Sequence, residues 1–241
     1  MHQFRYTAFM PINSDRILFQ DDSFLAVHKL SGELVVKGAG KVDKLPLLDF
    51  LRKEYPGLRT LQRLDFETSG VVLFARTKEA FERAVPTHQR EEDVPWTKTY
   101  RALVAGRVKS DQGEISTPLP ARSGKGMLRQ AQHRLVPALT RYRVLERFVN
   151  STYVEAQIET GRHHQIRRHF AKIGHPLCAD LVYGDRKFNR IFIQELHYKK
   201  FFLHAFSLEF IHPLTKEKTR IEAPMPKSFE VVLKKLRDAT N

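Results

Sequence analysis

Cysteine and long apolar runs are what this chain most clearly lacks. Its 241 residues include a single cysteine, Cys178, which excludes an internal disulfide and fits a reducing compartment. No run approaches the roughly 18 apolar residues that a membrane span needs, and residues 1–6 lack the apolar core of a signal peptide. We therefore expect a cytoplasmic protein without a membrane segment. We interpret Cys178 as a small buried residue and not as a catalytic thiol.

Acidic residues are also scarce relative to basic ones. Lys and Arg number 41 against 27 Asp and Glu, which gives a formal net charge of +14. Such an excess favours a polyanionic partner, because each phosphate that is neutralised releases a condensed counterion. The basic residues are spread along the chain and form neither a polybasic tail nor a basic amphipathic helix, so nucleic acid is favoured over a membrane surface.

The histidine and cysteine spacing does not predict a metal site. His164 and His169 are five residues apart and His163 and His169 are six apart, whereas two ligands on one helical face need a spacing of four. There is no Cys-x-x-Cys pair. We expect His204 and His212 to form hydrogen bonds within or beside a sheet.

The apolar pattern predicts an α+β protein. Strands are expected at 17–19, 24–27, 71–75, 98–105, 139–147, 151–158, 201–211 and 219–222, and helices from 47 to the Pro56-Gly57 stop, from 77 towards Pro86, over 163–173, and near the C-terminus. The strands and helices intermix without strict alternation, which favours a largely antiparallel sheet. We expect residues 1–16 to form an N-terminal arm and residues 17–241 a single domain.

Residues 108–136 read as a polar insertion, an exposed loop or hairpin. Its basic residues either contact RNA or form a solvated surface, and the sequence leaves both open; they are Arg122, Lys125, Arg129 and Arg134.

The octet RLDFETSG at residues 63–70 is the most informative segment. Asp65 follows an arginine and precedes a Thr-Ser-Gly turn, and the apolar run VVLFA comes directly after. Asp65 is therefore expected on a loop at a strand end, where catalytic groups are often found. The alternative is that Asp65 and Thr68 only close the turn through side-chain to backbone hydrogen bonds.

This octet resembles the R-L-D-x-x-T-S-G loop of the RluA-type pseudouridine synthases. Three further segments resemble blocks of the same family in the same order: KTYRALVAG at 98–106, TGRHHQIRRH at 160–169, and LHA at 203–205 followed by FIHP at 210–213. The resemblance extends from about residue 17 to the C-terminal helix.

The resemblance implies a mixed, largely antiparallel central sheet with flanking helices and an RNA-binding cleft. It implies an enzyme that isomerises uridine in structured RNA to pseudouridine, acting as a monomer without cofactor or metal. The first 16 residues leave no room for an additional RNA-binding domain of the S4 type. The doublet Arg167-Arg168 and residues 183–190 resemble the tRNA pseudouridine synthase C group, so tRNA is favoured over rRNA as the substrate.

Carried over residue by residue, the resemblance gives Asp65 as the catalytic carboxylate, Tyr100 as a ring that stacks on uracil, and Arg167 as the partner of Asp65. Basic side chains crowd the start of the helix expected near Gly161, where cations oppose the helix dipole and need an anion. A guanidinium paired with Asp65 would hold that carboxylate ionised and orient it bidentately. The expected RNA- or substrate-binding residues are Arg63, Thr68, Arg162, His164 and Ile166.

Three positions depart from the family pattern. Gln62 replaces a usual histidine, residues 28–30 read HKL where the family has Asn-Lys-Pro, and Ala179 stands before Asp180 where the family has glycine. Two functions of other classes also fit: a non-catalytic RNA-binding protein or RNA chaperone on the same fold, and a base hydrolase, which would release free uracil.

Overall fold

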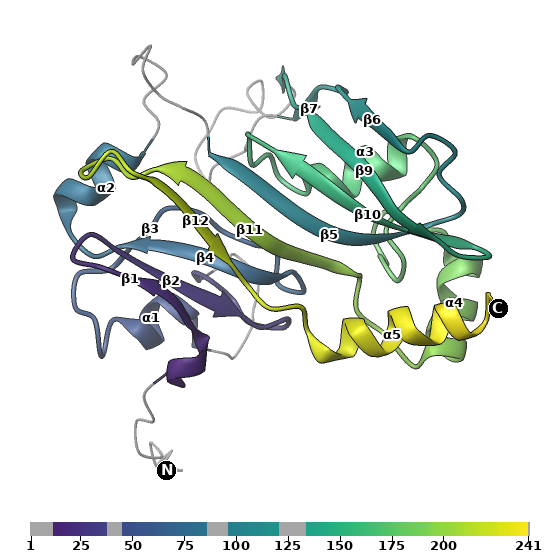
Figure 1. Cartoon of the computed structure of the whole chain (residues 1–241), viewed down its shortest axis with the longest axis horizontal. Helices are drawn as coiled ribbons and strands as arrows, with labels where there is room; N and C mark the ends of the chain where they lie inside the picture. The colour runs from purple at the N-terminus through teal and green to yellow at the C-terminus, as the bar shows by residue number, and fades with distance from the viewer. Residues whose placement is uncertain (1–11, 38–44, 86–95, 121–133, 241) are drawn as a thin grey trace, which may run out of the picture.

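The computed structural model describes residues 12–37, 45–85, 96–120 and 134–240 (Figure 1). A ten-stranded sheet runs in the order β1-β2-β4-β11-β5-β10-β9-β6, with β3 paired to β4 and β12 paired to β11. The strands are β1 Ile17–Gln20, β2 Phe24–Lys29, β3 Arg59–Thr60, β4 Ser69–Ala75, β5 Thr97–Ala105, β6 Gln112–Ile115, β9 Thr140–Arg147, β10 Ser151–Ile158, β11 Leu203–Ile211 and β12 Lys218–Glu222. Strands β7 (Leu119–Pro120) and β8 (Leu135–Val136) pair with each other.

The helices lie beside this sheet (Figure 1). They are α1 Leu47–Leu51, α2 Lys78–Ala84, α3 Gln165–Lys172, α4 Arg186–Leu196 and α5 Lys227–Asp238, and a short 3-10 helix covers Ser14–Arg16. Among the described helices, none is long and apolar enough to cross a membrane.

Both faces of the sheet are covered around β4, which is buried along its whole length. Alternate residues of a strand point to opposite faces. Val71 and Leu73 accordingly pack in the cluster that includes α2, and Val72 and Phe74 pack in the cluster that includes α1. The second half of the sheet repeats this arrangement. Tyr100 of β5 shares a cluster with α3, and Leu103, which points to the opposite face of the same strand, shares a cluster with α4 and α5.

The two halves of the sheet meet at a parallel pair. Of the described strand pairs, β4–β11 is parallel and the others are antiparallel. Gly70 of β4 lies opposite Ala205 of β11, and Ala205 lies opposite Tyr100 of β5. Gly70 has φ +120°, and a Cβ atom there would overlap the backbone of Ala205. The glycine at the end of the RLDFETSG octet therefore permits the close approach that joins the two halves.

Most of the predicted elements are confirmed. The strands expected at 98–105, 139–147, 151–158, 201–211 and 219–222 are β5, β9, β10, β11 and β12, and the sheet is largely antiparallel as predicted. Cys178 is buried, and burial raises the pKa of its thiol, so it is a packed core residue as interpreted. His204 and His212 form the expected hydrogen bonds, to Ser69 and to Asp21.

Two helices differ from expectation. The helix expected to run to Pro56 ends at Leu51, because the chain turns there and the Arg52 guanidinium donates to the Leu58 carbonyl. Helix α4 was not predicted from its mixed, strongly basic sequence. Asp185 starts it, since the Asp185 carboxylate accepts from the Phe188 backbone amide.

The described part of the polar insertion at 108–136 contributes three strands to the fold. Strand β6 extends the sheet by pairing with β9, and β7 and β8 form a separate hairpin base. Arg134 is exposed. The other three basic residues named for this insertion, Arg122, Lys125 and Arg129, lie outside the described residues.

The β4–β11 contact yields a stability prediction. Gly70→Ala should lower the free energy of unfolding by about 2 kcal/mol or more, because the new methyl group meets backbone and the φ angle is strained for alanine. Gly174→Ala is the matched control: its φ is +82° but nothing lies within 4 Å of the added Cβ, so the loss should be about 1 kcal/mol. Chemical denaturation measures both, and equal losses would contradict the proposed contact.

Candidate active site

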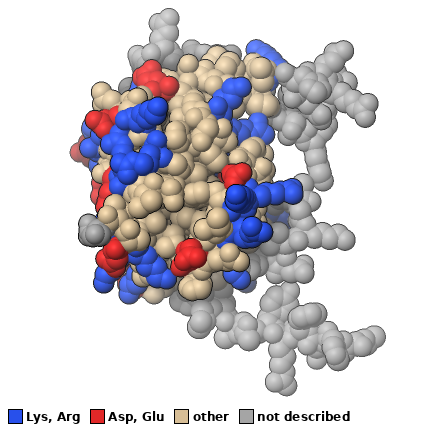
Figure 2. All heavy atoms as spheres, turned by 90° about the vertical axis from the view of Figure 1, so that its right-hand side faces the viewer, with Lys and Arg blue, Asp and Glu red and all other residues tan. Residues whose placement is uncertain are grey.

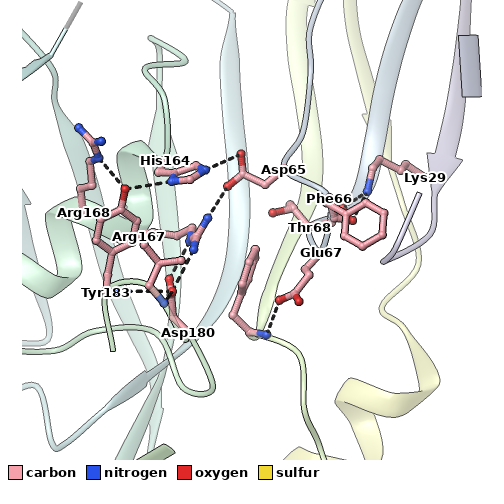
Figure 3. Close-up of polar contacts among 12 residues, drawn as sticks. Lys29, Asp65, Phe66, Glu67, Thr68, His164, Arg167, Arg168, Asp180 and Tyr183 are labelled. Carbon is pink, nitrogen blue, oxygen red and sulfur yellow. Dashed lines mark hydrogen bonds and ion pairs between the residues drawn. The ribbon is translucent and has the colours of Figure 1, made fainter. Parts of the chain in front are cut away.

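The Asp65 loop, residues 63–68, leads from β3 into β4, and a buried lysine binds its backbone carbonyls. Lys29, at the end of β2, has no exposed surface, and its Nζ donates to the carbonyls of Leu30, Phe66 and Thr68 at 3.1, 3.0 and 2.6 Å (Figure 3). Burial lowers the pKa of Lys29 to about 7, against the opposing charges of Glu33 and Asp65. The Phe66 and Thr68 carbonyls both lie shortly after Asp65 in the chain, so this clamp fixes the loop backbone that carries the carboxylate.

Arg167 joins Asp65 to a second carboxylate. Its Nη1 lies 3.2 Å from Asp65 Oδ2, which confirms the predicted pairing. The bidentate geometry expected for that pair is wrong: the fork of Nε and Nη2 binds Asp180, at 2.7 and 2.9 Å. Asp180 has no exposed surface, and its carboxylate binds two of the three guanidinium nitrogens. Only Nη1 is then left to bind Asp65. Sequence reasoning missed Asp180 as a partner.

Arg167 and Asp180 stay charged because the attraction between them offsets the cost of burying each charge. Burial opposes the charge of Arg167, but Asp180 and Asp65 outweigh it and hold the pKa of Arg167 above its ordinary value. Burial also opposes the charge of Asp180, yet the Arg167 fork and the backbone amides of Val182 and Tyr183 lower the pKa of Asp180. Both groups therefore remain ionised inside the protein.

The Asp180 turn, residues 179–184, is anchored to α4. Asn189 accepts from the Ala179 amide at 2.8 Å and donates to the Asp180 carbonyl at 2.8 Å. Ala179 has φ +62°, which is left-handed backbone that glycine adopts more easily. Glycine would therefore fit the position of Ala179 without backbone strain.

Aromatic rings enclose the Arg167 guanidinium. Its central carbon lies 4.4 Å from the centroid of Phe201 and 5.1 Å from that of Tyr183. Such rings attract the cation through their π faces and exclude water from it. The side chain of Arg167 is consequently 5% exposed, while that of Asp65 is 28% exposed and open to a ligand.

Helix α3 starts later than predicted. It begins at Gln165 and not near Gly161, because His164 adopts left-handed backbone with φ +55°. The Gln165 side chain holds this turn by accepting from the Arg162 amide at 3.1 Å and contacting the Thr160 hydroxyl at 2.9 Å. Arg162 and His164 therefore precede the helix, and fewer cations than expected lie in its first turn, where they would oppose the helix dipole.

One pocket brings together every site residue that the sequence predicted. Its lining comprises Arg63, Leu64, Asp65, Thr68, Tyr100, Ile158, Gly161, Arg162, His164, Gln165, Ile166, Arg167 and Leu203. Sequence reasoning had not named the apolar walls Leu64, Ile158 and Leu203, although their place on the strands and loop follows from the same motifs.

The pocket combines a neutral ring with unsatisfied polar atoms. Burial, together with the charge of Asp65, raises the pKa of Tyr100, so its phenol stays protonated. Within the described part of the chain, Thr68 Oγ1 and Arg162 Nε are buried atoms without a hydrogen-bond partner. Buried polar groups are normally satisfied, so these two atoms offer a donor and an acceptor to a ligand. No group of three potential metal ligands occurs among the described residues.

Comparisons with known proteins agree in pointing to one family. The family described as RNA pseudouridylate synthase matches residues 23–172. Ribosomal large subunit pseudouridine synthase C of Escherichia coli strain K12 is 39% identical over 231 residues, which cover 94% of this chain and 71% of that protein. The protein of the same name from Vibrio vulnificus strain CMCP6 is 37% identical over 224 residues, 92% of this chain and 70% of the relative.

Solved structures of two human proteins are also similar. Human RNA Pseudouridylate Synthase Domain Containing 1 matches with a TM-score of 0.65 and 28% identity, over 90% of this chain and 87% of that one. Human RNA Pseudouridylate Synthase Domain Containing 4 matches with a TM-score of 0.73 over 92% of each chain, and at 24% identity it supports the fold alone.

The Arg167 geometry predicts a large difference between two adjacent arginines. Arg167→Met leaves the buried Asp180 carboxylate without its fork, and the free energy of unfolding should fall by roughly 3–5 kcal/mol. Arg168→Met removes a single hydrogen bond to the Tyr183 hydroxyl and should cost about 1 kcal/mol. Urea titration of the two variants measures this difference. Similar losses would mean that the Asp180 pair does not stabilise the fold.

Proposed function

The chain belongs to the RNA pseudouridylate synthase family and is an RNA pseudouridine synthase, an isomerase, and we propose which of its residues catalyse the reaction and which RNA the enzyme modifies. We propose that Asp65 is the catalytic carboxylate, that Arg167 keeps it ionised and Tyr100 stacks on the uracil, and that the substrate is a uridine of large-subunit ribosomal RNA.

The observation that carries the proposal is the position of Asp65 as the one acidic side chain among the residues that line the pocket. The isomerisation breaks the N1–C1′ bond, turns the base and joins C5 to C1′, after which C5 loses a proton and N1 gains one. A glycosidase that hydrolyses its substrate needs a second carboxylate to activate water or the leaving group. Here the base itself returns to the sugar, so one carboxylate suffices. Attack at C1′ and removal of a 2′ proton both need that carboxylate ionised, which the Arg167 contact favours.

The walls of the pocket suit a uracil removed from its stack. Tyr100 is 8% exposed and lies with Ile166 and Leu203 in one apolar cluster beside Asp65. A flipped base is commonly held by stacking on an aromatic ring and by hydrogen bonds to its edge. The unpartnered Thr68 hydroxyl is a candidate for such a bond. Apolar walls also exclude water, which would otherwise attack C1′ and leave the base as free uracil.

Basic residues at the pocket supply the contacts to the RNA backbone. Arg63 and Arg162 line the pocket beside Asp65, and we assign them to the phosphates next to the target uridine. His164 and Ile166 complete the substrate-binding group. On the face shown in Figure 2, Lys and Arg side chains lie in separate groups, with Asp and Glu side chains beside them, around an uncharged area. The net charge of +14 accords with many phosphate contacts.

The choice of ribosomal RNA rests on the relatives. The two bacterial relatives described above are named for the ribosomal large subunit, whereas the sequence alone favoured tRNA over rRNA through residues 183–190. Most of this chain aligns with those relatives, so their RNA is the better proposal. We further propose that residues 17–241 act as a single catalytic domain in a monomer.

Replacing the carboxylate tests the catalytic assignment. Asp65→Asn is nearly isosteric but is neither basic nor nucleophilic, so pseudouridine formation should fall by at least about 1,000-fold, or ~4 kcal/mol in barrier terms. RNA affinity and melting temperature should change little. Tritium release from 5-tritiated uridine in RNA measures the rate. Turnover within tenfold of wild type would remove Asp65 from the mechanism, and free uracil as the product would identify a base hydrolase instead.

The same pair of proteins tests the RNA class. Cells that lack the gene are supplied with either wild type or Asp65→Asn, and pseudouridines are mapped in all RNAs. Wild type should restore sites in large-subunit rRNA, and Asp65→Asn should restore none. Restored sites confined to tRNA would overturn the ribosomal proposal and leave the enzyme assignment intact. A protein that restores no site in any RNA would favour the non-catalytic RNA-binding alternative.

A further inference from the structure

A line of polar groups connects Arg168 to Asp65 through Tyr183 and His164 (Figure 3). Arg168 Nε lies 2.9 Å from the Tyr183 hydroxyl oxygen, and arginine can only donate, so this oxygen accepts there. The Tyr183 proton is then available to a second neighbour. His164 Nδ1 lies 3.0 Å from the same oxygen, within hydrogen-bonding distance of that proton.

With Tyr183 as the donor to Nδ1, the tautomer of His164 follows. A neutral imidazole carries one proton, and a ring that accepts at Nδ1 must carry it on Nε2. His164 Nε2 lies 3.6 Å from Asp65 Oδ1, so the proton points at the carboxylate that Arg167 binds through Oδ2. That distance exceeds a hydrogen bond, but such contacts in unliganded sites commonly shorten when the substrate binds.

The surroundings of His164 keep the ring neutral. Asp65 faces it from the loop, Arg167 and Arg168 from α3, Tyr183 from the Asp180 turn, and His163 stacks on it at 3.7 Å between ring centroids. Burial lowers the pKa of His164 to about 4; Asp65 opposes this shift, and the neighbouring cations add to it. The imidazole is therefore uncharged throughout the physiological range.

The backbone at His164 is left-handed, with a φ of +55°. Positive φ is uncommon outside glycine, histidine adopts it more readily than most residues do, and such conformations cluster at functional sites. The Gln165 contacts to Arg162 and Thr160 hold it. The His164 ring faces Asp65, with Nε2 3.6 Å from Oδ1 (Figure 3).

We propose that His164 is a positioning residue, which donates its Nε2 proton to Asp65 Oδ1 and is held in that tautomer by Tyr183 and Arg168; this rests on the proposed catalytic role of Asp65. Arg167 then donates to Asp65 Oδ2 and His164 donates to Asp65 Oδ1, and together they fix the rotation of the Asp65 carboxylate. A neutral donor orients the carboxylate without adding a second cation, which would make it less basic and less nucleophilic. Since Nε2 already carries a proton, His164 is not the base that accepts a proton from the substrate.

Two substitutions at His164 separate positioning from folding. The Gln amide nitrogen reaches the place of Nε2, whereas the Asn amide reaches only as far as Nδ1. Asparagine, however, tolerates left-handed backbone better than glutamine. We expect His164→Gln to keep the single-turnover rate constant, measured at saturating RNA, within about tenfold of wild type, and His164→Asn to lower it about 100-fold. A purely structural role would reverse that order, and a rate for His164→Asn equal to or above that of His164→Gln would overturn the proposal.

Tyr183→Phe tests the tautomer independently of any change in the His164 backbone. Removing the hydroxyl leaves Nδ1 without its donor, and we expect the single-turnover rate constant to fall about tenfold when residue 164 is histidine. In His164→Gln the donor is an amide that has no tautomers, so adding Tyr183→Phe should change the rate less than twofold. Equal effects in the two backgrounds would show that Tyr183 acts in another way.

The pH dependence tests whether the donor is neutral. Wild type and His164→Gln should show profiles of the same shape between about pH 5.5 and 8, because His164 does not titrate there. An inflection near the ordinary histidine pKa that is present in wild type and absent from His164→Gln would overturn the neutral-donor assignment.

The Asp65→Asn variant, run in parallel, keeps the two proposals apart. If Asp65→Asn retains activity, the proposed function is wrong. If Asp65→Asn is inactive but the order of the His164 variants is reversed, only the positioning role is wrong. Melting temperatures check that each variant is folded, and should His164→Asn not fold, the Tyr183→Phe comparison alone decides the inference.

Discussion

The structure of the site depends on the ion pair between Arg167 and Asp180. Both side chains are buried, and the pair is geometrically complete, with two short bonds between fork and carboxylate. Because Asp180 occupies two arms of the guanidinium, the third is fixed in direction before any substrate arrives, and it meets Asp65. A buried pair of this kind contributes little to stability relative to apolar packing but is costly to break. Its value here is that it places a permanent cation beside the proposed catalytic carboxylate.

The other side of the site is fixed through the backbone. Lys29 ties the Phe66 and Thr68 carbonyls, which follow Asp65 in the loop, to the end of β2, and Gly70 lets β4 approach β11 closely enough to join the two halves of the sheet. The parallel pair thereby brings the Asp65 loop next to Tyr100, which β5 contributes from the second half. The carboxylate is thus held on one side by side chains of α3 and on the other by a clamped loop, so little rearrangement is needed for reaction.

Sequence patterns were sufficient for the residues that we propose to act on the substrate. Asp65, Tyr100 and Arg167 lie within short motifs on a loop, a strand and a helix, and the structure brings all three to one pocket with the five predicted binding residues. The supporting residues were not predictable in the same way. Asp180 lies in a turn whose role appears only when Arg167 is seen to bind it, and buried Lys29 is of a type that is ordinarily exposed. The late start of α3 depends on hydrogen bonds of the Gln165 side chain, which no periodic pattern records.

The most direct test of this account is the single-turnover rate constant of Asp180→Asn. Asp180 does not line the pocket, so the substitution leaves every proposed substrate contact in place while it weakens the fork that orients Arg167. Measured well below the melting temperature, the rate constant should fall at least about tenfold, or ~1.4 kcal/mol, with unchanged affinity for the RNA. A folded Asp180→Asn protein that reacts within about twofold of the wild-type rate would contradict the claim that the buried pair positions Asp65.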